Sequence, residues 1–223
     1  MATSNRSIVV IGLGTFGSTI ARELARYGNQ VIGIDMDDRR VNAHADDLSQ
    51  ALILDARDDS ALREAGIEDF DVGVVAMASD MEASILSTMN LRTIGVKEVW
   101  AKAATKNHHR ILMKLGVHRV VHPQAEVGVR VAQMVHNPMV RDFASLGNGY
   151  HIVNFRVPED LQGKGLDTLP HITSDKDSVR CIGVMRGTEF LGHDGSPCTL
   201  KADDILLFLG KRGDLRDFAD RMG

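Results

Sequence analysis

Cysteine is scarce in this sequence, and so are long apolar runs and blocks of basic residues. The 223 residues include only two cysteines, Cys181 and Cys198, whose spacing fits neither a disulfide framework nor a zinc site. No segment approaches the roughly 18 consecutive apolar residues of a membrane-spanning helix. No run of lysines or arginines occurs, and the net charge of -4 gives no attraction to nucleic acid. We therefore expect no membrane insertion, no nucleic-acid partner and no structural zinc.

The amino-terminal segment offers no targeting signal. Residues 1–7 are polar and lead directly into residues 8–11, an apolar run too short for a signal peptide. We expect the chain to stay in the cytoplasm and to meet a membrane only through a partner. Hydrophobic residues make up 43% and charged residues 25%, which is typical of a globular protein with a buried core. The length predicts one sizeable domain and a smaller second one.

From residue 7 to about 122, short apolar runs alternate with segments of helical periodicity. Phe16, Ile20 and Leu24, for example, recur every four residues before the helix ends at Gly28. Such alternation is typical of an α/β fold with a doubly wound parallel sheet, the Rossmann type. The expected strands are residues 7–11, 30–34, 50–54, 71–77, 98–102 and 118–122, and further helices are expected over 58–65, 79–94 and 105–115.

The pattern changes beyond this domain. Apolar residues continue over 127–135 and 139–146, and together they form more apolar surface than one crossover helix needs. Part of this surface either packs on a second copy of the chain or covers the chain's own sheet. Residues 146–149 are predicted to form a linker, after which polar and apolar residues alternate. The predicted domains are 1–146, of Rossmann type with the crossover helix, and 147–223, a small and mainly β domain. Its expected strands lie near residues 153–157, 180–186, 188–191 and 204–209, before a terminal helix over 213–222.

The strongest motif is the glycine-rich segment GLGTFG at residues 12–17, directly after a strand and directly before a helix. Gly12 permits the tight turn, Gly14 lets a phosphate approach the main chain, and Gly17 lets the helix pack close to the strand. Backbone N–H groups and the helix dipole then face the anion. We interpret the segment as a nucleotide-binding turn rather than as a tight connection without a ligand.

An acidic residue follows where this interpretation requires one. Asp35 closes the second strand, where the fold places a carboxylate that accepts hydrogen bonds from ribose hydroxyls, although a helix cap is the alternative role. A carboxylate there repels a 2′-phosphate, so NADP is disfavoured. Lys102, at the end of the fifth strand, either adds a cation near the phosphates or is solvated. Glu82 is either a partner of a helix dipole or a ligand contact. The remaining residues expected around the ligand are Thr15, Phe16, Met36, Asp37, Asp55, Ala56, Met77 and Ala78.

Residues for catalysis are not apparent in the sequence. A dehydrogenase needs an acid or base near the nicotinamide, and we find no convincing candidate. His108 and His109 are adjacent and so point in different directions from a helix. His118, His122 and His136 form no spacing typical of metal binding. We therefore predict no catalytic residue and no metal ion.

With these features in place, the chain resembles the RCK family, the cytosolic regulatory subunits of Ktr and Trk potassium uptake systems. The resemblance rests on VVIGLGTFGSTIARELARYGNQVIGID, the Asp55-Ala56 pair, VWAKA around Lys102, HHRILMKLGVHRVVHPQAEVGVRVA, and the segment from Val179 through GDLRDF. It implies a non-catalytic subunit that forms dimers within an octameric ring and docks beneath a potassium-translocating protein at the inner face of the cell membrane. In such relatives ATP favours transport and ADP disfavours it, and some members bind NAD(H). By resemblance, the nucleotide contacts are Gly12, Gly14, Gly17, Asp35, Asp55, Ala56, Glu82 and Lys102.

Two positions depart from the family's pattern. Thr15 stands where Ktr-like members carry an arginine that reaches the terminal phosphate of ATP. Gln124 stands where those members carry a glutamate that takes part in cation binding between subunits, and a neutral amide is a weaker ligand for a hard cation. The glycine-rich turn and the acid also permit two other interpretations. One is an NAD-dependent oxidoreductase with a small substrate domain, and the other is a nucleotide-binding subunit of some other complex.

Overall fold

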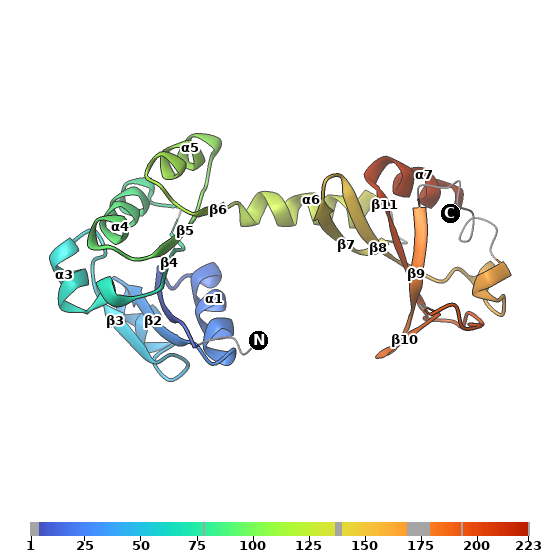
Figure 1. Ribbon diagram of the computed structural model, residues 1–223, viewed down its shortest axis with the longest axis horizontal. Helices are drawn as coiled ribbons and strands as arrows, with labels where there is room; N and C mark the ends of the chain where they lie inside the picture. Colours follow the sequence, from blue (N-terminus) through green and yellow to red (C-terminus); the bar gives the residue numbers. More distant parts are fainter. Residues whose placement is uncertain (1–4, 78, 137–139, 169–178, 193, 223) are drawn as a thin grey trace. The chain divides into compact units, whose positions relative to one another are not determined.

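The computed structural model describes residues 5–77, 79–136, 140–168, 179–192 and 194–222 (Figure 1). The chain divides into two compact units, residues 1–123 and 124–223. Each unit is built on its own sheet and has its own hydrophobic core. Among the described residues, no helix combines the length and the apolar character needed to cross a bilayer.

The first unit is a six-stranded parallel sheet with the strand order β3-β2-β1-β4-β5-β6. β1 pairs with β2 on one side and with β4 on the other, so the strand order reverses there. This is the order of the doubly wound Rossmann fold, and it confirms the fold predicted from the sequence. The strands are β1 (Ser7–Ile11), β2 (Gln30–Asp35), β3 (Gln50–Ile53), β4 (Val72–Val75), β5 (Glu98–Lys102) and β6 (Arg119–Val121). The helices are α1 (Thr15–Arg26), α2 (Asp38–Asn42), α3 (Asp59–Glu64), α4 (Met81–Ile94) and α5 (Lys106–Lys114).

Successive residues of β1 point into two separate cores. Val9 and Ile11 pack with residues of α3, α4 and α5, whereas Ile8 and Val10 pack with residues of α1 and α2. All four side chains are at most 4% exposed. Because helices cover both faces of the sheet, its central strand is apolar on both faces over residues 8–11.

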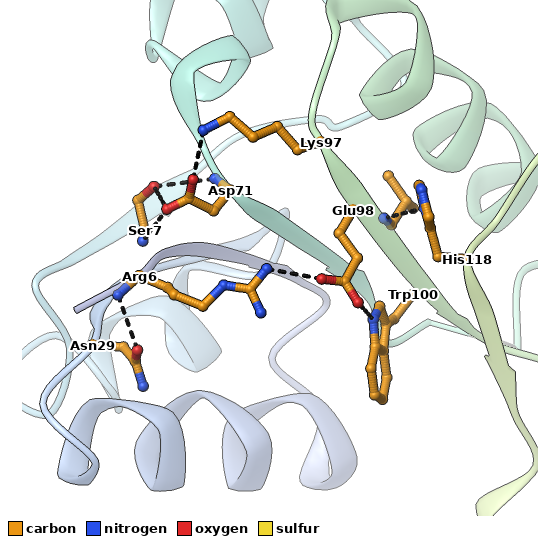
Figure 2. Close-up of polar contacts among 9 residues, drawn as sticks. Arg6, Ser7, Asn29, Asp71, Lys97, Glu98, Trp100 and His118 are labelled. Carbon is orange, nitrogen blue, oxygen red and sulfur yellow. Dashed lines mark hydrogen bonds and ion pairs between the residues drawn. The ribbon is translucent and has the colours of Figure 1, made fainter. Parts of the chain in front are cut away.

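Polar side chains close the amino-terminal edge of this sheet (Figure 2). Asp71, just before β4, accepts hydrogen bonds from Lys97 Nζ at 2.7 Å and from the N–H and hydroxyl of Ser7 at 3.0 Å. The Lys97 ammonium, and after it Ser7, hold the pKa of Asp71 well below its ordinary value. Glu98, the first residue of β5, accepts from Arg6 Nη2 at 2.8 Å. These contacts join the starts of β1, β4 and β5.

The second unit contains a five-stranded antiparallel sheet with the order β10-β9-β11-β8-β7. Its core includes Phe155, Phe208 and Phe218, and none of the three is more than 3% exposed. Phe218 comes from the terminal helix, which packs against β11 and β8. The mainly β second domain predicted from the sequence is therefore confirmed. Its elements are α6 (Pro123–His136), β7 (Val140–Gly147), β8 (Tyr150–Arg156), β9 (Val179–Arg186), β10 (Glu189–Leu191), β11 (Ile205–Lys211) and α7 (Arg212–Met222).

The structure corrects the sequence prediction around residue 146. β7 pairs antiparallel with β8, so residues 140–147 belong to the second sheet. Asn148 and Gly149 form the turn between the two strands rather than a linker. Both have positive φ angles, as does Gly147 at the end of β7, with values between +51° and +84°. The two compact units divide after Pro123, whereas the sequence analysis placed the domain boundary at residue 146. The five-residue helix α2 was also not predicted, because so short a helix shows no periodicity.

Candidate functional site

The glycine-rich turn connects β1 to α1, where the strand order of the sheet reverses. Gly12 has a φ of +93°, and its N–H donates to the Ile34 carbonyl at 2.7 Å. A Cβ atom on Gly17 would lie 1.8 Å from the Gly12 carbonyl oxygen and 2.9 Å from the Cβ of Ala76. Only glycine therefore fits at residue 17, and α1 packs as close to β1 and β4 as the sequence predicted.

Gly14 is the N-cap of α1, and no side chain caps this helix. Any residue can adopt its φ of -65°, and a Cβ atom added there would meet nothing within 4 Å. The first turn of α1, which begins with Thr15, also carries no acidic residue. The N-termini of α2 to α5 differ, since side chains of Asp37, Asp58, Asp80 and Thr105 cap them. Of these five helices, all within the described residues, α1 alone lacks a side-chain cap. An uncapped helix terminus leaves its backbone donors for an external anion.

Asp35 joins the end of β2 to the glycine-rich turn. Its Oδ2 atom accepts from the Leu13 N–H at 2.7 Å and lies 3.4 Å from Arg40 Nη1, while its Oδ1 atom accepts from the Asp37 N–H at 3.0 Å. The residue is 9% exposed. The alternative role as a helix cap belongs to Asp37 instead, which accepts from the Arg39 N–H at 3.0 Å. The Asp35 carboxylate thus lies beside the turn, where a ribose would follow a bound phosphate.

The loop after β3 contains Asp55 and Ala56, which the sequence predicted for the site, and Arg57, which it did not. Asp55 forms an ion pair with Arg57, in which Nε and Nη2 of the guanidinium donate at 2.9 and 2.7 Å. This pair holds the pKa of Asp55 below its ordinary value. Arg57 Nη2 also lies 3.9 Å from the Sδ atom of Met36, which is 60% exposed at the end of β2. Ala56 between them is buried.

Lys102 is the last residue of β5, and its side chain lies close to the first turn of α1. Its Nζ atom lies 5.3 Å from the centre of the Phe16 ring, in the first turn of α1. The side chain is partly buried, so it is held near the amino end of α1 and is not a freely solvated lysine. A phosphate at the turn would therefore have a cation nearby.

The end of β4 supplies the other wall of the turn. A Cβ atom on Gly12 would lie 3.2 Å from the Met77 backbone nitrogen, so these two backbones are in close contact. Asp80 caps α4 by accepting from the Ala83 N–H at 2.9 Å, and Glu82 lies exposed in the first turn of the same helix. This position suits the interpretation of Glu82 as a partner of the helix dipole. Ala78 lies outside the described residues.

Four of the histidines, His108, His109, His118 and His122, belong to α5 or directly flank β6. His108 is fully buried, its Nδ1 atom accepts from the Ala104 N–H at 3.3 Å, and burial lowers its pKa. Nδ1 of the neighbouring His109 lies 2.9 Å from Nε2 of His122, and His118 Nδ1 accepts from a backbone N–H of β5 at 3.0 Å. Within the described ranges, no three histidine, cysteine or acidic side chains are arranged to hold a metal ion.

Three residues of the site were missed in the sequence. Arg40 and Arg57 approach the two acids at the ends of β2 and β3, and Asn90 of α4 donates to the carbonyl oxygens of Ala56 and Arg57 at 3.1 and 2.8 Å. The arginines could have been suspected from their spacing, because each lies within five residues of a predicted acid. Asn90 carries no such signal, since it lies more than thirty residues from its partners.

Comparison with known families agrees with this geometry. The family model described as the TrkA-N domain matches residues 8–123, which is the Rossmann unit from β1 to the start of α6. The chain belongs to the TrkA-N family. This TrkA-N protein is 32% identical to the Ktr system potassium uptake protein A of Vibrio alginolyticus, over 96% of its own length and 97% of the relative. The resemblance to Ktr and Trk subunits noted in the sequence is thereby confirmed.

Solved structures extend the likeness to the second unit. The crystal structure of the GsuK RCK domain matches the whole TrkA-N protein with a TM-score of 0.67 at 13% identity. The structure of the GsuK channel bound to NAD matches it with a TM-score of 0.63 at 12% identity. The chain spans about half of the first of these, 49%, and 40% of the second. The two structures share the fold of both units.

Proposed function

We propose that this TrkA-N protein is a nucleotide-binding regulatory subunit of a potassium uptake system of the Ktr or Trk type. The observation that carries the proposal is the amino terminus of α1, where Gly14 leaves backbone donors open beside the Asp35 carboxylate. The relationship to Ktr protein A supports the transport role. The chain is proposed to act as a sensor and not as an enzyme.

The ligand is proposed to be an adenine nucleotide, ATP or ADP, with NAD(H) as the alternative. Its diphosphate lies against the amino end of α1, where the helix dipole and Lys102 offset the negative charge. Its ribose hydroxyls donate to Asp35, and NADP is disfavoured because a 2′-phosphate would meet that carboxylate. NAD is kept as the alternative because the GsuK channel, which shares this fold over part of its length, has been solved bound to NAD. The contacts proposed for this chain are Gly12, Gly14, Thr15, Phe16, Gly17, Asp35, Met36, Asp37, Asp55, Ala56, Met77, Ala78, Glu82 and Lys102.

The working form is proposed to be a homo-oligomer, with dimers assembled into an octameric ring. An apolar stretch of α6 supports self-association, because Val127, Val131 and Val135 are 55%, 44% and 75% exposed in the single chain. Exposed apolar surface of this kind usually marks an interface. The ring is proposed to lie on the cytoplasmic side of the membrane beneath an integral potassium-translocating subunit. Two ligands can switch such a ring only if they bind its two conformations with different affinities.

Substitutions of Gly14 test the nucleotide site. Gly14→Asp adds a carboxylate that caps α1 and occupies the space proposed for the phosphate. We expect a folded protein whose affinity for ADP falls about a hundredfold, because two negative charges meet at contact distance. Isothermal titration calorimetry with ATP, ADP, NAD and NADH measures the effect. The matched control is Gly213→Asp, since a Cβ atom at Gly213 also meets nothing within 4 Å and lies in the second unit.

Two results would overturn the proposal. One is failure of the wild-type protein to bind any of the four nucleotides at millimolar concentration. The other is turnover of an NADH-linked substrate that requires Lys102, which would favour the oxidoreductase instead. Association with a transporter is tested separately, by purifying the tagged protein from its own cells. We expect a potassium-translocating membrane protein and a bound adenine nucleotide to co-purify with it.

A further inference from the structure

The order of the strands fixes the direction in which a nucleotide would lie. The glycine-rich turn follows β1, Asp35 ends β2, and β3 is the next strand of the sheet on the same side. Asp35 is paired with Ile53 of β3, and its carbonyl accepts from the Leu54 N–H at 3.2 Å. A nucleotide with its phosphates at β1 and its ribose at β2 therefore places its base over the loop that follows β3.

Two exposed side chains of different loops meet at this place. Met36 follows β2, Arg57 follows β3, and the Nη2 atom of the arginine lies 3.9 Å from the Sδ atom of the methionine. The Met36 side chain is 60% exposed and the Arg57 side chain is 40% exposed. A flat guanidinium and a polarisable thioether are both groups that pack on aromatic rings.

The orientation of Arg57 is fixed from two sides. Its side chain donates to Asp55 through Nε and Nη2, and its own backbone N–H donates to the same carboxylate at 3.0 Å. Below the loop, the buried Asn90 amide donates to the Arg57 carbonyl at 2.8 Å and to the Ala56 carbonyl at 3.1 Å. A side chain held in this way loses little conformational freedom when a ligand binds.

The charge of Arg57 is largely balanced by its neighbours. The Asp55 carboxylate is in direct contact with the guanidinium, and Asp80 and Glu82 add negative potential around it. A balanced cation attracts a distant phosphate only weakly, since the opposing charges cancel over a few ångströms. Its planar face, in contrast, keeps its ability to stack on a base.

We propose that Arg57 recognises the base of the bound nucleotide, with its guanidinium plane stacked on the purine ring and Met36 in contact with the same ring. The inference rests on the proposed function, because it requires a nucleotide in the site. Stacking on the base is independent of the phosphate chain. Arg57 therefore contributes equally to the binding of AMP, ADP and ATP, whereas Lys102 and the α1 terminus contribute more as phosphates are added.

The test compares Arg57→Ala and Arg57→Lys with wild type by calorimetry, with AMP, ADP and ATP at low and high salt. We expect both variants to lose about tenfold in affinity, by the same factor for the three ligands and at both salt concentrations. Lysine keeps the charge but lacks the plane, so it does not rescue binding. Arg63→Ala is the matched control, because Arg63 is an exposed arginine of α3 that pairs with Asp59 at 3.9 Å.

Three outcomes would overturn the inference. They are unchanged affinity in Arg57→Ala, rescue by Arg57→Lys, and a loss that grows with the number of phosphates and disappears at high salt. Because Arg57→Ala leaves Asp55 unpaired, the double variant Asp55→Asn/Arg57→Ala is measured against Asp55→Asn alone. We expect the loss of Arg57 to lower the affinity by the same uniform factor in that background. If wild type and Arg63→Ala bind no nucleotide at all, the proposed function fails. If both bind and Arg57→Ala binds equally well, only this inference fails.

Discussion

The two edges of the six-stranded sheet are built from opposite kinds of contact. At the amino-terminal edge, polar and charged side chains form hydrogen bonds with one another: Lys97 and Ser7 donate to Asp71, and Arg6 donates to Glu98 (Figure 2). At the carboxyl-terminal edge, the turn after β1 carries glycines and leaves the helix terminus uncapped at Gly14. Both edges belong to the same strands, so the difference lies in the residues that flank them.

This difference separates stability from function. The hydrogen bonds that Asp71 and Glu98 accept from their own chain stabilise the fold at the amino-terminal edge. An uncapped helix terminus lacks that stabilisation and keeps its N–H groups for an anion. We therefore expect changes at the amino-terminal edge to affect unfolding alone, and changes at the carboxyl-terminal edge to affect binding.

The largest expected effect is that of Gly17→Ala. Gly17 lies at the carboxyl-terminal edge, but we expect this substitution to destabilise the fold, which would be an exception to the division between the two edges. The new Cβ atom would lie 1.8 Å from the Gly12 carbonyl oxygen, a backbone atom that cannot move aside. We expect the free energy of unfolding to fall by about 3 kcal/mol or more, measured by urea denaturation. Gly14→Ala is the control and should stay within about 0.5 kcal/mol of wild type. Equal stability of the two variants would contradict the described packing.

Asp35→Ala is expected to affect both properties. The buried Leu13 N–H loses its acceptor, which costs about 2 kcal/mol of stability. The ribose loses its carboxylate partner, so the affinity for ADP should fall at least about tenfold. Urea denaturation and calorimetry on the same preparation measure the two effects. A variant that is destabilised but binds normally would show that Asp35 only supports the turn.

Asp71→Asn tests the other edge and should be milder. The pKa of Asp71 lies below its ordinary value of 3.8 because Lys97 and then Ser7 donate to the carboxylate. A lowered folded-state pKa stabilises the protein above about pH 4, and this contribution is lost as the pH falls toward the folded-state value. We expect the variant to be less stable than wild type at pH 7 and the gap to close in acid, with ADP affinity unchanged. A gap that widens in acid, or a loss of affinity, would contradict this account.

The smallest expected effect is that of Lys102→Ala. The ammonium lies beside Phe16 and adds a cation near the proposed phosphates. We expect affinity for ADP to fall about three- to fivefold at low salt and less at high salt, without a change in stability. Calorimetry at two salt concentrations measures it, and Lys106→Ala, an exposed lysine at the start of α5, is the control.

Much of the first unit could be predicted because its signals are local. Each strand, and each helix except the short α2, lies within one apolar or periodic segment. The glycine-rich turn with Asp35 specifies the binding edge once the fold is known. The amino-terminal network could not be predicted in this way, since Ser7 and Asp71 are 64 residues apart in the sequence. Arg57 was missed for a related reason, because its role depends on how the loops after β2 and β3 approach each other.

The second unit was harder to predict at its beginning. Residues 140–147 become a strand only because β8 pairs with them, and the segment alone continues the apolar pattern of α6. Residues 147–149, at the end of β7 and in the turn after it, include two glycines, which are equally typical of a linker and of a hairpin. Pairing between strands is a tertiary property, and it decided both features.

The most direct test of the central claim is an amide NMR titration of the wild-type protein with ADP, repeated with NAD. We predict that the largest chemical-shift changes fall on the N–H groups of residues 13–17 and 35–37, while those of Ser7, Asp71 and Glu98 stay where they are. Changes confined to the amino-terminal edge, or no change at the turn when the nucleotide is in excess, would contradict the claim that the open terminus of α1 holds the ligand.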